Sequence, residues 1–128
     1  MYSNPPPSQC TRTGDGPLVF GHRGARGHAP ENTLLGIETG IRLGADWIEV
    51  DVHLNAGNPV LMHDLTLDRT TNGRGFVADV PPDYLAELDA GRGQKVPSVL
   101  DAIDMIDRRA CLLYHSVAAH DYRTLDSL

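Results

Sequence analysis

The stretch from Asp46 to Leu54 constrains the fold of this chain most, because it alternates strictly between apolar and polar residues. Successive side chains of a β-strand point to opposite faces of a sheet. One face of this strand is aliphatic and holds Ile48, Val50, Val52 and Leu54. The other face is mostly polar and holds Trp47, Glu49, Asp51 and His53. We therefore expect a strand whose aliphatic face packs in a hydrophobic core.

The residues before this strand predict a strand followed by a helix. Pro17–Phe20 is a short apolar run, which is typical of a buried strand. A helix is expected between Asn32, its N-cap, and Gly44, its stop signal, because apolar residues recur there at helical spacing. Gly36 and Gly40 lie inside this helix and would let it approach a neighbouring sheet closely.

The residues after this strand predict a third strand and an insertion. Pro59–Met62 is another short apolar run, and it follows a turn at 55–58. The segment 65–96 is polar and punctuated by glycine, with one short helical stretch around 82–88. An irregular segment of this length inside a compact domain is usually functional.

The last elements complete the order of an α/β fold. Ser98 and Asp101 predict a capping box at the start of a second amphipathic helix. Cys111–Tyr114 is expected to begin a further strand. The order strand, helix, strand, strand, insertion, helix, strand is typical of the α/β class.

Length and charge exclude several classes of protein. A chain of 128 residues provides one domain at most. Its 17 Asp and Glu residues outnumber 11 Lys and Arg residues, and the net charge of −6 excludes nucleic acid or an anionic membrane as partner. No apolar run approaches the ~20 residues that span a bilayer. Residues 1–16 are polar and proline-rich without the apolar stretch of a secretory signal, so we expect a disordered tail and a cytoplasmic location.

Glu49 and Asp51 are the candidates for a metal site. Side chains two residues apart on a strand point the same way, with Cβ atoms roughly 7 Å apart. On an exposed sheet face, two such residues would serve solubility alone. If both faces of the strand are covered, the carboxylates repel one another in a confined space, and Mg²⁺ or Ca²⁺ would relieve that repulsion.

Two histidines and an arginine extend this candidate site. His22 follows the first strand and His63 follows the third, and the carboxyl ends of strands in a parallel α/β sheet line up where ligands bind. Paired histidines suit acid–base chemistry. Arg23 offers a guanidinium fork for a phosphate, and His53, which shares the acidic face, is taken as structural. Together these residues indicate metal-assisted cleavage of a phosphate ester.

Six short motifs occur in an order and at a spacing that are specific as a set. They are His22-Arg23-Gly24, Pro30-Glu31-Asn32-Thr33, Glu49-Val50-Asp51-Val52, His63-Asp64, Leu67-Asp68-Arg69-Thr70-Thr71 and Val96-Pro97-Ser98-Val99-Leu100. This series resembles the opening part of the glycerophosphodiester phosphodiesterase family, from about Pro17 to Arg109.

The resemblance implies a TIM-type (β/α)8 barrel with its active site at the carboxyl ends of the strands. His22 and His63 would be the acid–base pair, one helping the glycerol hydroxyl to attack phosphorus and the other protonating the leaving alcohol. Arg23 would bind the phosphate. Glu49 and Asp51 would be two of the ligands of a divalent cation, Ca²⁺ or Mg²⁺. The implied activity is hydrolysis of glycerophosphodiesters, which are small-molecule substrates, to glycerol 3-phosphate and an alcohol.

The chain is much shorter than a complete barrel, which needs about 250 residues. We therefore expect roughly the first half of the barrel at 17–110, including the family's insertion at 65–96, and a divergent tail at 111–128. The third carboxylate ligand implied by the resemblance is absent, because Cys111–His115 occupies its place. We expect that the natural reading frame was lost, or the gene truncated, near Ala110.

An incomplete barrel has physical consequences. Its sheet would keep open edges with unpaired backbone groups, through which copies of the chain would associate. A site with two carboxylates would hold a metal weakly, and we expect little or no diesterase activity from the isolated chain. Two alternatives stay open: a truncated, non-catalytic remnant of the family, and a related barrel phosphodiesterase that acts on phospholipid head groups.

Overall fold

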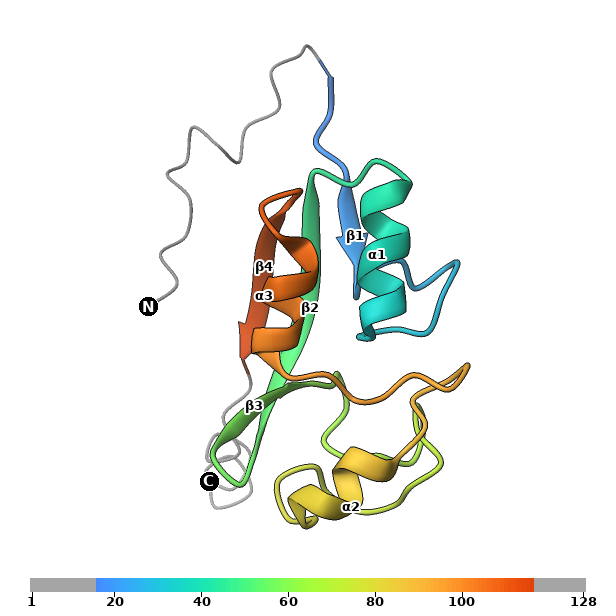
Figure 1. The fold of residues 1–128 in the computed structure, drawn as a ribbon, viewed down its shortest axis with the longest axis vertical. Coiled ribbons are helices and arrows are strands. Elements are labelled where there is room, and N and C mark those ends of the chain that lie inside the picture. Colours follow the sequence, from blue (N-terminus) through green and yellow to red (C-terminus); the bar gives the residue numbers. More distant parts are fainter. Residues whose placement is uncertain (1–15, 117–128) are drawn as a thin grey trace, which may run out of the picture.

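The computed structural model describes residues 16–116 as an open four-stranded sheet, with two helices packed on the aliphatic face of its central strand (Figure 1). The elements in chain order are β1 (Phe20–His22), α1 (Leu34–Arg42), β2 (Trp47–Asn55), β3 (Asn58–Leu61), α2 (Pro82–Glu87), α3 (Val99–Ile106) and β4 (Cys111–Ser116). The expected tail at 1–16 lies outside the described residues except for its last position, as does 117–128 of the expected tail at 111–128. None of the described helices is long and apolar enough to cross a membrane.

The sheet is built around β2, which has a parallel partner on each edge. β1 runs parallel to β2, with Phe20 opposite Trp47 and His22 opposite Glu49. Trp47 also pairs with Cys111 of β4, so β1 and β4 lie on opposite edges of β2. The outer edges of β1 and β4 pair with no further strand in the described part of the chain, which confirms the expected open sheet. Self-association through these edges stays a prediction.

β3 is antiparallel to β2 and lies on the same edge of it as β1. The two strands form a hairpin around Ala56 and Gly57, whose φ angles of 48° and 79° are typical of a two-residue hairpin turn. Val52 pairs with Leu61 of β3 and with Ser116 of β4, so these two strands take opposite edges of β2. β1 and β3 therefore share one edge of β2, where β1 pairs with its first residues and β3 with its last residues.

The aliphatic face of β2 packs in the main hydrophobic core, as the sequence predicts. Ile48, Val50 and Val52 are nearly or fully buried there against α1 and α3. The helices contribute Ile37, Ala102 and Ile106 to this core. Leu54 was expected on the same buried face but is exposed, because it lies beside the hairpin turn and outside the core.

The insertion at 65–96 folds around a second, smaller core. This core contains Val60, Met62, Leu67, Val77, Leu85 and Leu88. Helix α2 confirms the short helical stretch expected around 82–88. The buried side-chain amide of Asn55 donates to the carbonyl oxygens of Val77 and Val80, both at 2.8 Å. These two hydrogen bonds tie the insertion to the end of β2.

The first strand begins three residues later than the sequence predicts. It spans Phe20–His22 instead of Pro17–Phe20. The carbonyl oxygen of Val19 accepts a hydrogen bond from the backbone N–H of Trp47 at 3.1 Å, and the ladder with β2 starts only after it. The shift places His22 in the last position of β1 instead of in the loop that follows.

The two main helices begin at side-chain caps, one of which the sequence misplaces. Thr33, not Asn32, caps α1, because its side chain accepts the backbone N–H of Gly36 at 3.0 Å. Asn32 instead has a left-handed φ of 53°, and its side chain is bonded to β2. The capping box of Ser98 and Asp101 at the start of α3 is confirmed.

Glycines let α1 approach the loop after β1 and the central strand closely, as the sequence predicts. A Cβ atom on Gly40 would lie 2.9 Å from the carbonyl oxygen of Gly24 and 3.0 Å from Cδ1 of Ile48. Gly24 itself has a φ of 89°, and a Cβ atom there would lie 2.6 Å from the carbonyl carbon of Gly36. The loop at 22–24 is therefore held tightly between α1 and β2.

Replacing Gly40 with alanine should destabilise the fold, which reverses the usual effect of this change in a helix. Alanine in a helix interior is normally about 1 kcal/mol more favourable than glycine. Here the added methyl group meets the backbone of Gly24, and overpacking costs about 1–3 kcal/mol. We expect Gly40→Ala to lower the Tm of the full chain in a circular-dichroism melt.

Gly27→Ala is the control, because the Cβ that it adds has no atom within 4 Å apart from those of residue 27 and its two chain neighbours. Its Tm should stay close to that of the wild type. A higher Tm for Gly40→Ala than for the wild type would contradict the close packing of α1.

Candidate active site

The polar face of β2 is covered, so Glu49 and Asp51 lie away from bulk solvent. Glu49 is 9% exposed, and the side chain of Asp51 is 14% exposed. Both point to one face of the sheet, because side chains of a strand alternate. Burying two carboxylates is costly unless donors or cations compensate their charge. The structure therefore excludes an exposed face that serves solubility alone.

The end of β1 provides a donor for Glu49. The backbone N–H of Arg23 donates to Oε2 of Glu49 at 3.3 Å, and Nε2 of His22 lies 3.7 Å from the same oxygen. His22 stands opposite Glu49 in the parallel ladder, which explains this proximity. The side chain of His22 is 59% exposed, so a ligand can reach it.

The guanidinium group of Arg23 lies between two carboxylates. Its Nη1 donates to Oε2 of Glu31 at 2.6 Å, and its Nε lies 3.4 Å from Oδ2 of Asp51. This Nε is buried and makes no hydrogen bond to any residue of 16–116. Arg23 therefore compensates the charge of both carboxylates, although its Nε approaches Asp51 as an ion pair and not as a hydrogen bond.

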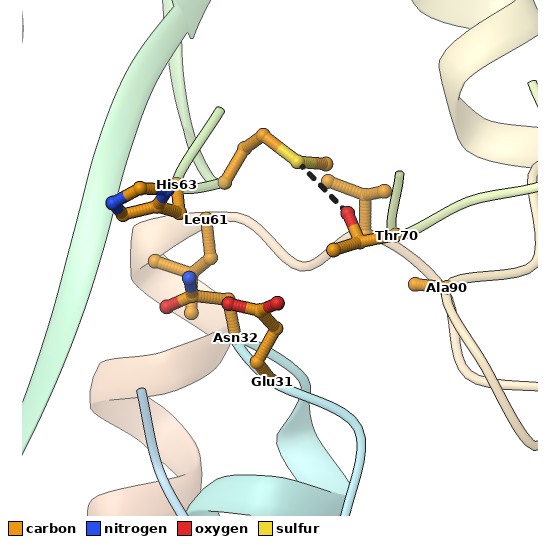
Figure 2. Close-up of a pocket in the computed structure, with 8 residues that line it drawn as sticks. Glu31, Asn32, Leu61, His63, Thr70 and Ala90 are labelled. Carbon is orange, nitrogen blue, oxygen red and sulfur yellow. Dashed lines mark hydrogen bonds between the residues drawn. The ribbon is translucent and has the colours of Figure 1, made fainter. Parts of the chain in front are cut away.

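His63 reaches this site by a route that differs from the predicted one. The prediction placed it at the carboxyl end of a parallel strand, but β3 is antiparallel. The hairpin returns the chain to the level of Asp51, whose carbonyl oxygen accepts the N–H of Met62 at 3.0 Å. His63 follows directly and, with Glu31 and Asn32, lines a cavity of about 10 Å³, which has room for about one water molecule (Figure 2).

His63 and Asp64 form a hydrogen-bonded pair. Nδ1 of His63 lies 2.7 Å from Oδ1 of Asp64, and Arg69 donates to both oxygens of Asp64. The hydrogen bonds from Arg69, with a smaller contribution from His63, hold the pKa of Asp64 well below its usual range. An ionised Asp64 favours the proton on Nδ1 and leaves Nε2 of His63 for proton transfer. His53 is buried, and its Nε2 lies 3.0 Å from the carbonyl oxygen of His63.

Glu31 bridges two arginines and links the insertion to the site. Its Oε2 accepts a hydrogen bond from Arg23, and its Oε1 accepts one from Arg69. Burial raises the pKa of Glu31, but the hydrogen bonds from Arg69 and Arg23 outweigh burial and lower this pKa. A chain of alternating charges therefore runs from Asp64 through Arg69, Glu31 and Arg23 to Asp51.

Comparison with known proteins identifies the family in which these residues occur. The sequence model of the glycerophosphoryl diester phosphodiesterase family matches residues 22–123. The chain belongs to this family. A glycerophosphodiester phosphodiesterase of Caldanaerobacter subterraneus is 41% identical over 97 residues, which cover 70% of this chain and 40% of that relative.

Solved structures of glycerophosphoryl diester phosphodiesterases share the described fold. A phosphodiesterase of Oleispira antarctica, in complex with the product sn-glycerol-3-phosphate, matches with a TM-score of 0.78 and 36% identity over 82% of this chain and 46% of that one. The glycerophosphodiester phosphodiesterase of Agrobacterium tumefaciens matches with a TM-score of 0.74 and 36% identity over 77% and 46%. These enzymes are TIM barrels, and the described residues form a partial α/β fold. The chain spans less than half the length of these relatives.

Two carboxylate oxygens of this family member are available to a cation. Oε1 of Glu49 and Oδ1 of Asp51 accept no hydrogen bond from the described residues. Carboxylate oxygens are the ligands that Mg²⁺ and Ca²⁺ prefer. Within residues 16–116, no group of three or more His, Cys, Asp or Glu side chains is arranged to hold a metal ion. These two carboxylates alone would leave most of the ligand positions of a Mg²⁺ or Ca²⁺ ion to water or substrate.

β4 places no carboxylate beside this pair. Leu113 stands opposite Glu49, and His115 stands opposite Asp51, in the parallel register of β2 and β4. Paired residues of neighbouring strands share a face of the sheet. A third carboxylate on this strand would have to occupy one of these two positions, which carry leucine and histidine.

The sequence analysis gave no role in the site to four residues that shape it, namely Glu31, Asn32, Asp64 and Arg69. All four belong to motifs by which the chain resembles its family, so the signal was present in the sequence. Their partners, however, lie as far as 38 residues away along the chain, as between Arg69 and Glu31. Only the structure shows which of these charged and polar side chains pair.

Arg69→Gln should weaken the fold at neutral pH and weaken it less in acid. The pKa of Asp64 and of Glu31 is lower in the folded than in the unfolded chain, so their ion pairs stabilise the fold fully above the unfolded-state values of about 4. This stabilisation is lost as the pH falls toward the folded-state values. Because Arg69 is partly exposed and solvent screens its pairs, we expect a loss of about 1 kcal/mol at neutral pH, measured by urea unfolding.

Arg74→Gln controls for the loss of an exposed arginine that makes no ion pair within the described residues. It should change the free energy of unfolding little at either pH. An equal loss for Arg69→Gln at neutral and acidic pH would show that packing, and not the ion pairs, is responsible.

Proposed function

We propose that this site carries residues for the hydrolysis of glycerophosphodiesters to glycerol 3-phosphate and an alcohol with the help of a divalent cation, and that the lack of a third carboxylate keeps its turnover low. The proposal depends on one observation, the covered pair of carboxylates on β2 next to His22 and in reach of the loop that carries His63. The Oleispira antarctica relative holds the product sn-glycerol-3-phosphate, which supports a glycerophosphodiester as the substrate.

Glu49 and Asp51 would hold the cation, Ca²⁺ or Mg²⁺, through Oε1 and Oδ1. When bound, the cation stabilises the negative charge that develops on the phosphate oxygens. Arg23 would bind a phosphate oxygen through its guanidinium fork, which lies beside Asp51. These three side chains would fix the phosphorus atom close to the two imidazoles.

His22 and His63 would act as the acid–base pair. Attack by the glycerol hydroxyl needs one group that accepts its proton and one that donates a proton to the leaving alcohol oxygen. Water then opens the resulting cyclic phosphate to glycerol 3-phosphate, with the two groups exchanging roles. His63 suits such a role, because Asp64 binds its Nδ1 and leaves its Nε2 for the substrate. His22 is exposed beside Glu49, so its Nε2 is accessible from the same side.

We also propose that the described residues are the first half of a TIM-type barrel, since the chain covers 46% of each of two solved relatives and its sheet is open.

A second candidate function, that of a non-catalytic remnant, is favoured by the register of β4. Leu113 and His115 stand where a third carboxylate would face the cation. We therefore expect weak metal binding and slow or absent turnover.

Calcium should stabilise the full chain if Glu49 and Asp51 form the cation site. A tenfold excess of Ca²⁺ over its Kd adds about 1.4 kcal/mol to the free energy of unfolding, which appears as a higher Tm. Glu49→Gln and Asp51→Asn should abolish this increase. Asp79→Asn, which removes an exposed carboxylate of the insertion, should retain it. A wild-type Tm that does not respond to Ca²⁺ or Mg²⁺ would overturn the proposed site.

A third carboxylate on β4 should raise the activity. We expect the wild-type chain to release little or no glycerol 3-phosphate from glycerophosphocholine, measured with an enzyme-coupled assay. His115→Glu places a carboxylate opposite Asp51, so it should tighten Ca²⁺ binding and produce metal-dependent release. Tyr114→Glu adds the same charge on the opposite face of β4 and should produce none.

Further variants distinguish the alternatives. In the His115→Glu background, His63→Asn should lower release about 100-fold or more. Calcium binding without release in every variant would favour the non-catalytic remnant. Release only from a phosphoinositide or a sphingolipid would favour a related barrel phosphodiesterase that acts on phospholipid head groups.

A further inference from the structure

Along one edge of β2, the backbone hydrogen bonds pass from the β1 side to β3 and leave a gap at Asp51. On the β1 side, the carbonyl oxygen of Glu49 accepts the N–H of Gly24 at 3.2 Å. On the β3 side, the carbonyl oxygen of Asp51 accepts the N–H of Met62 at 3.0 Å. The N–H of Asp51 lies between these two bonds. A buried N–H without a partner is destabilising, so this position needs an acceptor.

The side chain of Asn32 fills this gap. Its Oδ1 accepts the N–H of Asp51 at 3.2 Å, and its Nδ2 donates to Oδ2 of Asp51 at 3.1 Å. One side-chain amide therefore binds both the backbone and the carboxylate of the same residue. At Asp51, this amide takes the place that a backbone peptide group of a neighbouring strand would have in a continuous ladder.

The backbone holds Asn32 in the position that this contact requires. Asn32 is 4% exposed, and its N–H donates to the carbonyl oxygen of Arg23 at 2.9 Å. Its φ of 53° is left-handed, a conformation that asparagine adopts more readily than most residues. The position thus demands both an amide of this length and a backbone that tolerates positive φ.

We infer that Asn32 is a positioning residue for Asp51. By binding the N–H and Oδ2, it fixes the rotation of the carboxylate and leaves Oδ1 for a ligand. The inference rests on the proposed function, in which Asp51 binds a divalent cation. Asn32 acts through Asp51 in this arrangement, because both polar atoms of its side-chain amide bind that residue. Removing a partner that orients a metal ligand typically costs about 10- to 100-fold in metal affinity.

Asn32→Gly tests this inference on the full chain, because glycine accepts the left-handed backbone and removes both hydrogen bonds. Calorimetric titration with Ca²⁺ should show an affinity about tenfold or more below that of the wild type. Thr33→Ala is the matched control. It removes the cap of α1 at the next position and costs stability, but it leaves Asp51 untouched, so its affinity for Ca²⁺ should stay close to that of the wild type.

Hydrogen exchange measured by NMR gives a second readout that needs no metal. In the wild-type chain, the Asp51 amide and the side-chain amide of Asn32 should exchange slowly with solvent. The side-chain amide of the exposed Asn58 should exchange fast. In Asn32→Gly, the Asp51 amide should exchange faster than in Thr33→Ala.

The outcomes separate this inference from the proposed function. Unchanged Ca²⁺ affinity in Asn32→Gly, with affinity lost in Asp51→Asn, would overturn the positioning role and leave the proposed function standing. Fast exchange of the Asn32 side-chain amide in the wild type would overturn the positioning role as well. If the wild-type chain binds no Ca²⁺, the proposed function fails, and the inference fails with it.

Discussion

The structure depends on compensating two carboxylates that one covered strand carries on the same face. Water cannot fully solvate Glu49 and Asp51, so protein groups must supply hydrogen-bond donors and positive charge. The backbone N–H of Arg23 donates to Glu49, the side chain of Asn32 donates to Asp51, and the guanidinium of Arg23 supplies the positive charge. Arg23 reaches β2 because its loop lies against α1 at the distance that Gly24 allows. The packing of this loop against α1 therefore also determines how the charges of Glu49 and Asp51 are compensated.

Much of the fold could be predicted from the sequence. When apolar and polar residues alternate along a strand, the apolar residues mark the face that packs in the core. The alternation along β2 predicts its aliphatic and acidic faces, and apolar spacing with capping residues predicts the helices. The start of α1 could not be predicted, because Asn32 and Thr33 are both good N-cap residues. The choice between them depends on Asp51, which lies 19 residues away and takes the side chain of Asn32.

Most residues of the candidate site could be predicted from the sequence, but their contacts could not. The sequence analysis placed His63 near Glu49 and Asp51 because it took the strand before His63 as parallel to β2. That strand, β3, is antiparallel, and a short apolar run does not encode the direction of a strand. The role of Asp64 beside His63 was likewise hidden, although the two are adjacent in the chain. Its ionisation depends on Arg69, whose contacts the fold of the insertion provides.

The tight turn at Ala56 and Gly57 has a consequence for how this family member can vary. His63 arrives at the site only because the chain reverses within two residues and keeps its register with β2. One additional residue in the turn would shift that register and carry the imidazole to the other side of the sheet. The length of the turn at Ala56 and Gly57 is therefore restricted, although the turn itself lies outside the site, because this length determines on which side of the sheet His63 lies.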